Sequence, residues 1–136
     1  MRWHDFISNP KAITYLYNEV PPLDSMEVKS IILKSSGPTL TFCMDFPRFA
    51  DNKPPRWAKE SNTVSVELDF FAVKNLHIDG FSPIQNLDFL LRKDGNLISV
   101  TVDGKACHID FVCLDISIQK VTGYINAERK SVPMGQ

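Results

Sequence analysis

The stretch LDFLLRKDGNLISVTVDGKACHIDFVC, residues 87–113, decides the fold. It contains two Asp-Gly pairs, Asp94-Gly95 and Asp103-Gly104, and this dipeptide is typical of a two-residue hairpin turn. Apolar and polar residues alternate on both sides of each pair, which is the period of a half-buried strand. The stretch therefore predicts a three-stranded antiparallel meander.

The two turns also predict a register for the meander. Two-residue loops at both Asp-Gly pairs bring apolar residues opposite one another. The predicted pairs are Leu91 with Ile98, Phe89 with Val100, Leu87 with Val102, Val100 with Cys107 and Ile98 with Ile109. All these side chains fall on one face of the sheet, and a slip of one residue in either turn would destroy that agreement.

The same alternation extends over much of the remaining chain. Residues 28–34 and 39–46 flank a turn cluster and are predicted to form a first hairpin. Residues 62–72 predict a long strand, and residues 75–83 predict a short strand, or the continuation of the long one, followed by a turn. Residues 116–125 have an ambiguous period, and their β-branched residues favour a closing strand over a short helix.

A short helix is expected near the N-terminus. Asn9-Pro10 is a typical helix start, because Asn accepts hydrogen bonds from free amides and Pro tolerates the first helical position. Apolar residues then form one stripe, and Pro21-Pro22 ends the helix after about two to three turns. The stripe consists of Ile13, Leu16, Tyr17 and Val20.

These elements define an α+β fold class that is predominantly antiparallel β. We expect a sheet of about six to eight strands, curled or folded into a sandwich with the C-terminal meander, plus the short N-terminal helix. At 136 residues the chain is long enough for one core and too short for two. A single domain is therefore expected over residues 1–126, with a flexible tail over residues 127–136.

Composition argues against several partners and locations. The formal net charge is −1 and the Lys and Arg residues are scattered, so nucleic acid is not an expected partner. The apolar stretches are too short to span a membrane, and the first five residues lack the apolar segment of a secretory signal. Three cysteines without a CxxC motif, Cys43, Cys107 and Cys113, fit reduced thiols in the cytoplasm.

The polar residues do not form a recognisable catalytic or metal-binding motif. Cys107 and His108 are adjacent, but consecutive strand residues point to opposite faces and cannot act as nucleophile and base. His77 with Asp79, and His108 with Asp110, are two ligands each, too few for a metal site. We therefore expect neither enzyme activity nor a cofactor. A small-molecule-binding or hydrolytic β-barrel is the less favoured alternative.

Residues 47–61 interrupt the strand pattern with three prolines. Trp and Arg beside rigid prolines offer a large contact area at low entropic cost, so the segment is a candidate recognition surface. The alternative is that Phe49 and Trp57 close one end of the sheet as a plug, because Trp is strongly buried on average. The two roles are compatible.

Several short motifs follow one another along nearly the whole chain except the tail. The most distinctive is Pro54-Pro55-x-Trp57 followed by Asn62. The others are Asn9-Pro10, Pro21-Pro22-Leu23, Gly37-Pro38, Asp45 through Phe49, Asn62-Thr63-Val64, Cys113 and Tyr124. In this order they resemble the immunity protein 50 family of bacterial polymorphic-toxin systems.

The resemblance implies a cytoplasmic protein that binds and inhibits a cognate toxin, without catalysis and without a cofactor. Many such toxins are nucleases with basic clefts, which acidic side chains on a strand face would suit. The partner-binding candidates, from the loop and the polar strand faces, are Asp45, Arg48, Phe49, Asp51, Arg56, Trp57, Glu67, Asp69 and Asp88. The alternative is a non-inhibitory interaction or assembly module, or a homodimer, formed through an exposed sheet edge.

Overall fold

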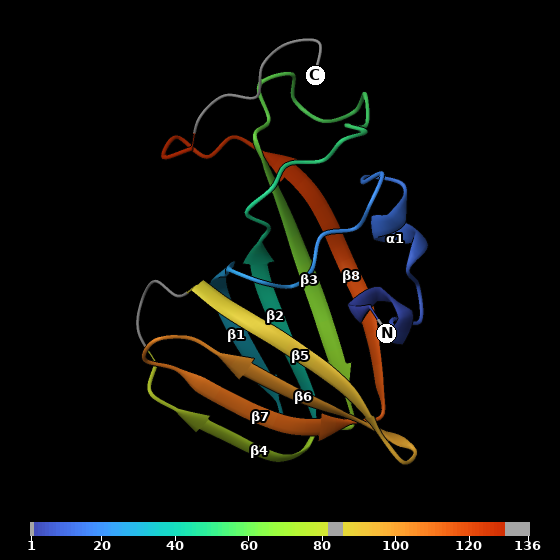
Figure 1. Cartoon of the computed structure of the whole chain (residues 1–136), viewed down its shortest axis with the longest axis vertical. Helices are drawn as coiled ribbons and strands as arrows, with labels where there is room; N and C mark the ends of the chain where they lie inside the picture. The colour runs from blue at the N-terminus through green and yellow to red at the C-terminus, as the bar shows by residue number, and fades with distance from the viewer. Residues whose placement is uncertain (1, 82–85, 130–136) are drawn as a thin grey trace.

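The computed structural model describes residues 2–81 and 86–129 (Figure 1). The described part contains a 3-10 helix, η1 (Trp3–Phe6), a one-turn helix, α1 (Lys11–Thr14), and eight strands. The strands are β1 (Met26–Lys34), β2 (Thr39–Asp45), β3 (Thr63–Phe71), β4 (Lys74–Asp79), β5 (Asn86–Asp94), β6 (Leu97–Asp103), β7 (His108–Cys113) and β8 (Asp115–Tyr124). Neither helix of this part is long and apolar enough to cross a membrane.

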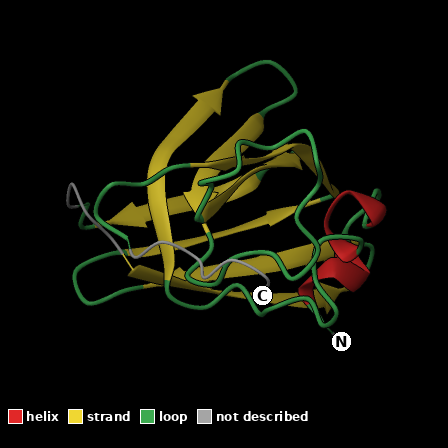
Figure 2. Ribbon diagram, turned by 90° about the horizontal axis from the view of Figure 1, so that it is seen from above, coloured by secondary structure: helices red, strands yellow, loops and turns green. Residues whose placement is uncertain are grey.

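The strands form one open antiparallel sheet in the order β4-β7-β6-β5-β1-β2-β3-β8. Among the described residues, two pairs join β1 to β5, Met26 with Leu87 and Glu27 with Asn86. The sheet folds over at this narrow seam, so that β5, β6, β7 and β4 lie in a layer against the other four strands (Figure 1, Figure 2). The predicted fold class, an antiparallel sheet folded into a sandwich with a short N-terminal helix, is confirmed.

Aromatic side chains from both layers meet in the interior. Phe42 on β2 lies with its ring centroid 5.5 Å from that of Phe70, 5.1 Å from that of Phe89 and 6.5 Å from that of Phe111. All four rings are buried or nearly so. Packed side chains therefore occupy the space between the layers, which argues against a barrel with a central ligand cavity.

The first meander turn has the predicted face but a different register. β5 pairs Leu91 with Val100 and Phe89 with Val102, a shift of two residues from the predicted pairs. The turn residues are Gly95 and Asn96, and Gly95 has a φ of 63°. Glycine is required at the first central position of a type II′ turn, so Gly95 rather than Asp94 begins the loop.

The second turn shifts the register further. β6 pairs Ile98 with Cys113 and Val100 with Phe111, four residues from the predicted pairs. The loop has four residues, 104–107, instead of two, and within it the Gly104 amide donates to the Cys107 carbonyl at 2.8 Å. Both shifts are even numbers of residues, so the apolar side chains remain on the predicted face.

The N-terminal helix is shorter than predicted, because α1 spans four residues. Asn9 does not cap it. The Asn9 side chain instead accepts a hydrogen bond from the Ile118 amide and donates one to the Ile118 carbonyl, both at 2.8 Å. The Ser8 amide also donates to the Ile116 carbonyl at 2.9 Å, so this segment covers the outer edge of β8. The predicted apolar stripe is nevertheless buried, with Ile13, Leu16 and Tyr17 at most 2% exposed.

Two ambiguous segments are strands. Residues 116–125 were expected to be a closing strand rather than a helix, and β8 occupies them to Tyr124. β4 is separate from β3, because Ala72, which lies between them, has a φ of 54° and breaks the extended chain. The turn predicted after β4 lies partly outside the described residues, as does most of the predicted tail.

Candidate functional site

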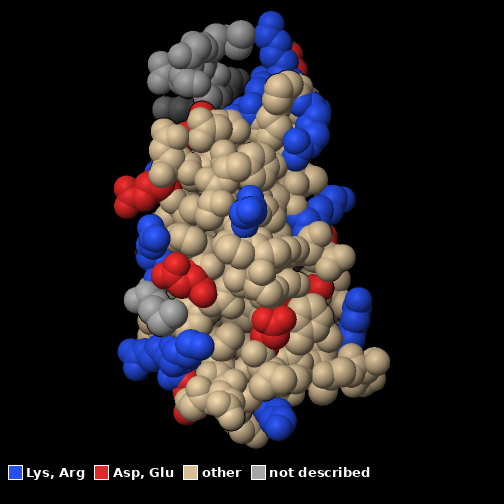
Figure 3. Space-filling view, turned by 90° about the vertical axis from the view of Figure 1, so that its right-hand side faces the viewer, with Lys and Arg blue, Asp and Glu red and all other residues tan. Residues whose placement is uncertain are grey.

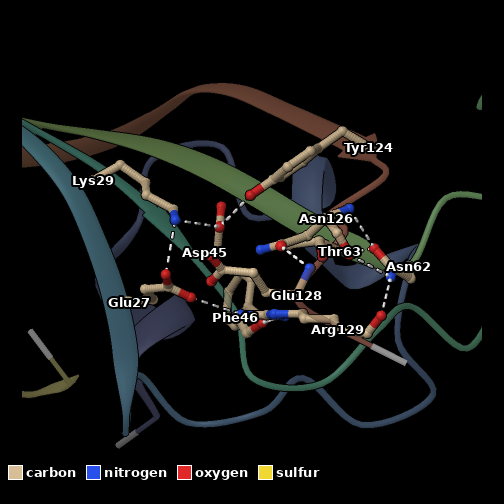
Figure 4. A network of polar contacts seen from close by, with 10 residues as sticks. All are labelled: Glu27, Lys29, Asp45, Phe46, Asn62, Thr63, Tyr124, Asn126, Glu128 and Arg129. Atoms are coloured by element: carbon tan, nitrogen blue, oxygen red, sulfur yellow. Dashed lines mark hydrogen bonds and ion pairs between the residues drawn. The ribbon is translucent and has the colours of Figure 1, made fainter. Parts of the chain in front are cut away.

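Asp45, the first candidate residue, lies buried at the end of β2 with 1% of its surface exposed. The Tyr124 hydroxyl donates to its Oδ2 at 2.5 Å, and the Lys29 ammonium lies 3.8 Å from the same oxygen (Figure 4). Burial and the neighbouring carboxylate raise the pKa of Tyr124, which therefore stays a neutral donor at physiological pH. Asp45 thus links β2 to β8 and to β1.

Further polar contacts extend from this link (Figure 4). Arg129 donates to the Phe46 carbonyl at 2.6 Å and to the Glu27 carboxylate at 3.3 Å. The Asn62 side chain accepts from the Asn126 amide at 2.8 Å and donates to its carbonyl at 3.0 Å. These bonds fasten residues 125–129 over the end of the sheet from which the loop of residues 47–61 departs.

Trp57 closes this end of the sheet. It is 9% exposed, and its ring lies directly on Gly123 of β8, where a Cβ atom would stand 2.2 Å from Trp57 Cε3. The half-buried Phe49 ring lies beside it, with a centroid separation of 6.0 Å. The structure thus has Phe49 and Trp57 in the plug arrangement, which anchors the loop to the strands.

The loop is braced against the turn that follows α1. Hydrogen bonds between main chain and side chains join the two segments at several points, and the residues involved are more than 30 positions apart. The bonds are Asn52 N to Leu16 O at 2.9 Å, Asn18 N to Asp51 Oδ2 at 2.9 Å and Tyr17 Oη to Arg48 O at 2.8 Å. The loop is therefore held at both its base and its tip.

Two arginines and a tyrosine lie on the outside of this braced region. Arg48 forms an ion pair with Asp51 at 2.5 Å and lies over the Tyr17 ring, 5.5 Å from its centroid. Burial raises the pKa of Tyr17 far above its ordinary value, so it remains protonated. Arg56 donates to the hydroxyl of Tyr15 at 2.9 Å, and the Tyr15 side chain is 45% exposed.

We name this region the Tyr15–Arg56 surface. It consists of Tyr15, Arg48, Asp51, Asn52 and Arg56, all exposed side chains. Lys and Arg side chains gather at the upper end of the molecule (Figure 3), at the height of the loop of residues 47–61 in Figure 1. The loop has four basic and two acidic residues, whereas the whole chain has a net charge of −1.

Three acidic candidates on the strands lie outside this surface. Glu67 and Asp69 are half-buried on the outer face of β3, and Asp69 accepts a hydrogen bond from Thr41 at 2.6 Å. Asp88 on β5 accepts a hydrogen bond from the Ser25 amide at 2.8 Å, where Ser25 has a φ of 54°. The structure therefore brings the loop candidates together and separates them from the acidic strand residues.

Two members of the surface were not among the predicted candidates, Asn52 and Tyr15. Asn52 at least lies in the loop that the sequence singled out, whereas Tyr15 does not. Tyr15 stands between Ile13 and Leu16 of the apolar stripe, on the side of the turn that faces away from the core. An exposed aromatic residue beside a buried stripe was the one available signal, and it does not identify what the ring contacts. Its neighbour Arg56 comes from a loop 41 residues away.

A separate polar cluster lies on β7 near the edge strand β4. Both ring nitrogens of His108 contact carboxylates, Nδ1 that of Asp103 at 2.5 Å and Nε2 that of Asp110 at 2.8 Å. His77 contacts Asp110 at 3.3 Å. Hydrogen bonds to Asp103 and Asp110 raise the pKa of His108. Within residues 2–81 and 86–129 no group of three or more such side chains is arranged to hold a metal ion.

Comparison with known proteins gives one match. The family model described as immunity protein 50 matches residues 9–124 of the chain. No curated protein and no solved structure matches the chain. The matched stretch begins at Asn9, which covers the edge of β8, and ends at Tyr124, which bonds to Asp45, so it includes the braced loop and both of its anchors.

Proposed function

The chain belongs to the immunity protein 50 family, and from this membership we propose that it binds a cognate bacterial toxin in the cytoplasm and neutralises it. A neutralising protein blocks an active site or holds its toxin inactive. That task requires tight, complementary binding and no chemistry of its own. The family match is the observation on which this proposal depends.

We propose the Tyr15–Arg56 surface as the toxin contact. Tyrosine and arginine are enriched among residues that dominate binding energy at protein interfaces. The surface is also fixed before binding, because the hydrogen bonds to residues 15–18 and the Trp57 anchor hold the loop. Fixing a loop in advance reduces the entropy lost on association, which favours high affinity.

Glu67 and Asp69 form a second candidate face, on the outside of β3. Their carboxylates would suit a toxin with a basic cleft. Asp69 is already engaged by Thr41, whereas the Tyr15–Arg56 surface combines exposure, aromatic area and fixed geometry. We therefore give the loop surface preference and use the β3 face as a comparison in the experiment.

The experiment is co-expression with the toxin encoded by the neighbouring gene, followed by calorimetry on the purified pair. We expect protection of the cell and nanomolar one-to-one binding. Tyr15→Ala should weaken binding by about thirtyfold or more, as at an interface hot spot, and abolish protection at low expression. Arg92→Ala, on the opposite end of the molecule in the β5 hairpin, is the matched control.

Wild-type protein that neither binds nor protects would refute the proposed function. Normal binding by Tyr15→Ala together with weakened binding by the double variant Glu67→Gln/Asp69→Asn would move the contact to β3. Circular dichroism of each variant checks that the fold is retained.

Self-association is the second candidate function, and the edge of β1 favours it. After Glu27, β1 pairs with β2 alone among the described strands. Ile32 and Leu33 on this open edge are 44% and 59% exposed. Open strand edges are templates for pairing with another chain. Light scattering that shows a concentration-dependent dimer, abolished by Ile32→Lys, would support this alternative, and a monomer at high concentration would exclude it.

A further inference from the structure

We propose that the Tyr15–Arg56 surface accepts an acidic segment of the toxin, in which an Asp or Glu carboxylate pairs with Arg56. This inference rests on the proposed function and names the chemistry of the partner at that same surface.

Arg56 has unused hydrogen-bonding capacity. Its guanidinium has five N–H donors, and one bond, to the Tyr15 hydroxyl at 2.9 Å, is formed within the described part of the chain. No carboxylate among those residues lies within ion-pair distance of it. The planar guanidinium binds carboxylates in a two-point geometry, so an incoming carboxylate is the partner that completes it.

Arg48, the other arginine of this surface, differs from Arg56 in having an ion-pair partner. Arg48 already pairs with Asp51 and lies over the Tyr17 ring, so its charge is compensated within the chain. Lys53, by comparison, donates to the main-chain carbonyls of Ala58 at 3.4 Å and Lys59 at 2.9 Å, which are neutral. The loop therefore presents positive charge around Arg56 that the described residues do not neutralise.

Arg56 is also held in place by its neighbours in sequence. Pro54 and Pro55 restrict the backbone before it, and the buried ring of Trp57 anchors the chain immediately after it. The Trp57 amide donates to the Pro54 carbonyl at 3.1 Å and closes the turn on which Arg56 lies. An arginine fixed in this way loses little main-chain freedom when it forms an ion pair.

An acidic protein segment fits this surface better than a nucleic acid does. Affinity for a polyanion comes from many phosphate contacts together, and a net charge of −1 provides no long-range attraction. A single uncompensated arginine beside a tyrosine suits one carboxylate with adjoining side chains.

The test uses Arg56→Lys, which puts a primary amine at this position. In the complex with the toxin encoded by the neighbouring gene, a carbodiimide joins that amine to a carboxylate that touches it. Mass spectrometry should then identify an Asp or Glu of the toxin linked to residue 56. Arg92→Lys, at the far hairpin, is the control and should give no such link.

Affinity provides the second readout. Arg56→Gln should weaken binding by about thirtyfold or more, which corresponds to a hot-spot residue, and Arg56→Glu should weaken it further. Arg92→Gln should stay within about twofold of wild type. Raising the salt concentration should weaken wild-type binding more than Arg56→Gln binding, because an exposed ion pair is screened.

The outcomes separate this inference from the function on which it rests. Absence of any wild-type binding refutes the function itself. Suppose instead that wild type binds tightly and Tyr15→Ala weakens the binding. If Arg56→Glu then binds as tightly as wild type, or no cross-link forms at residue 56, the proposed acidic segment is refuted and the proposed function still holds. Fluorescence anisotropy with single- and double-stranded oligonucleotides gives a further check. Binding that Arg56→Gln abolishes would overturn the inference in favour of nucleic acid.

Discussion

Gly123→Ala tests how the loop is anchored, because one added methyl group would collide with the plug. An ideal Cβ at Gly123 stands 2.2 Å from Cε3, 2.5 Å from Cδ2 and 2.8 Å from Cζ3 of Trp57. These atoms belong to the rigid indole rather than to the end of a flexible chain. Either the ring or the strand must move.

The expected magnitude follows from two opposing terms. Alanine normally stabilises a strand interior by roughly 0.5–1 kcal/mol relative to glycine. Overpacking a tight contact costs roughly 1–3 kcal/mol, and complete expulsion of the Trp57 ring would cost about 4–6 kcal/mol of burial as an upper bound. We expect a net loss of about 2 kcal/mol in the free energy of unfolding, which corresponds to a Tm about 7 °C lower for a domain of this size.

Urea unfolding followed by circular dichroism measures the loss, and calorimetry gives the Tm. The emission of Trp57 should shift to longer wavelength as the ring gains exposure. Trp57→Phe provides the matched background, since a smaller ring leaves room for the methyl group. In that background Gly123→Ala should cost less than about 1 kcal/mol, and the difference is the coupling between the two positions.

A Gly123→Ala protein as stable as wild type, or more stable, would refute this reasoning. Such a result would mean that no steric cost offsets the usual stabilisation by alanine, and that the Trp57 ring does not rest on Gly123. An equal loss in both backgrounds would likewise show that the methyl group collides with something other than the indole.

Three further predictions concern other contacts. Tyr124→Phe removes the donor to buried Asp45 and should lower the free energy of unfolding by about 1–3 kcal/mol in urea titrations. Asn9→Ala removes both bonds to the edge of β8, and we expect faster hydrogen exchange of the exposed β8 amide with a loss of about 1–2 kcal/mol. By NMR titration the pKa of His108 should lie above 6.5, and Asp103→Asn should lower it. A raised folded-state pKa means that this contact stabilises the fold below pH 6.5 and that its contribution disappears as the pH rises through the pKa of the folded protein.

Alternation in the sequence was sufficient to predict the faces of the sheet but not its register. The apolar residues predicted to face the core in β2, β3 and the meander are buried as expected, because the two-residue period places them on one face. The exceptions on β2 are Thr41 and Asp45, which were predicted on the polar face and are also buried. Register depends on which turn residue adopts a positive φ, and Gly95 rather than the Asp-Gly pair determines it. The same limitation applies to α1, where Asn9 forms hydrogen bonds with β8 instead of capping the helix.

The candidate surface could be predicted only in part. Composition identified the loop of residues 47–61 as ordered and aromatic, and it identified Arg48 and Arg56. The bonds from Asn18 to Asp51 and from Asn52 to Leu16 could not be predicted, because they join segments without a period that are far apart in the sequence. An irregular loop has no repeat from which its partners can be inferred.

The short sequence motifs contain both residues that stabilise the fold and an exposed arginine, and the two kinds of residue should respond differently to substitution. Four residues of these motifs are buried or hydrogen-bonded to a distant strand, so they stabilise the fold. We call them the frame residues, and they are Asn9, Asp45, Trp57 and Tyr124. Arg56 lies in the same motif as Trp57 but is exposed, with the Tyr15 hydroxyl as its hydrogen-bond acceptor. Variants of the frame should therefore lower stability and toxin affinity together, whereas Arg56→Gln should lower affinity at unchanged stability. Parallel losses of stability and affinity for Arg56→Gln would mean that this residue, too, belongs to the frame.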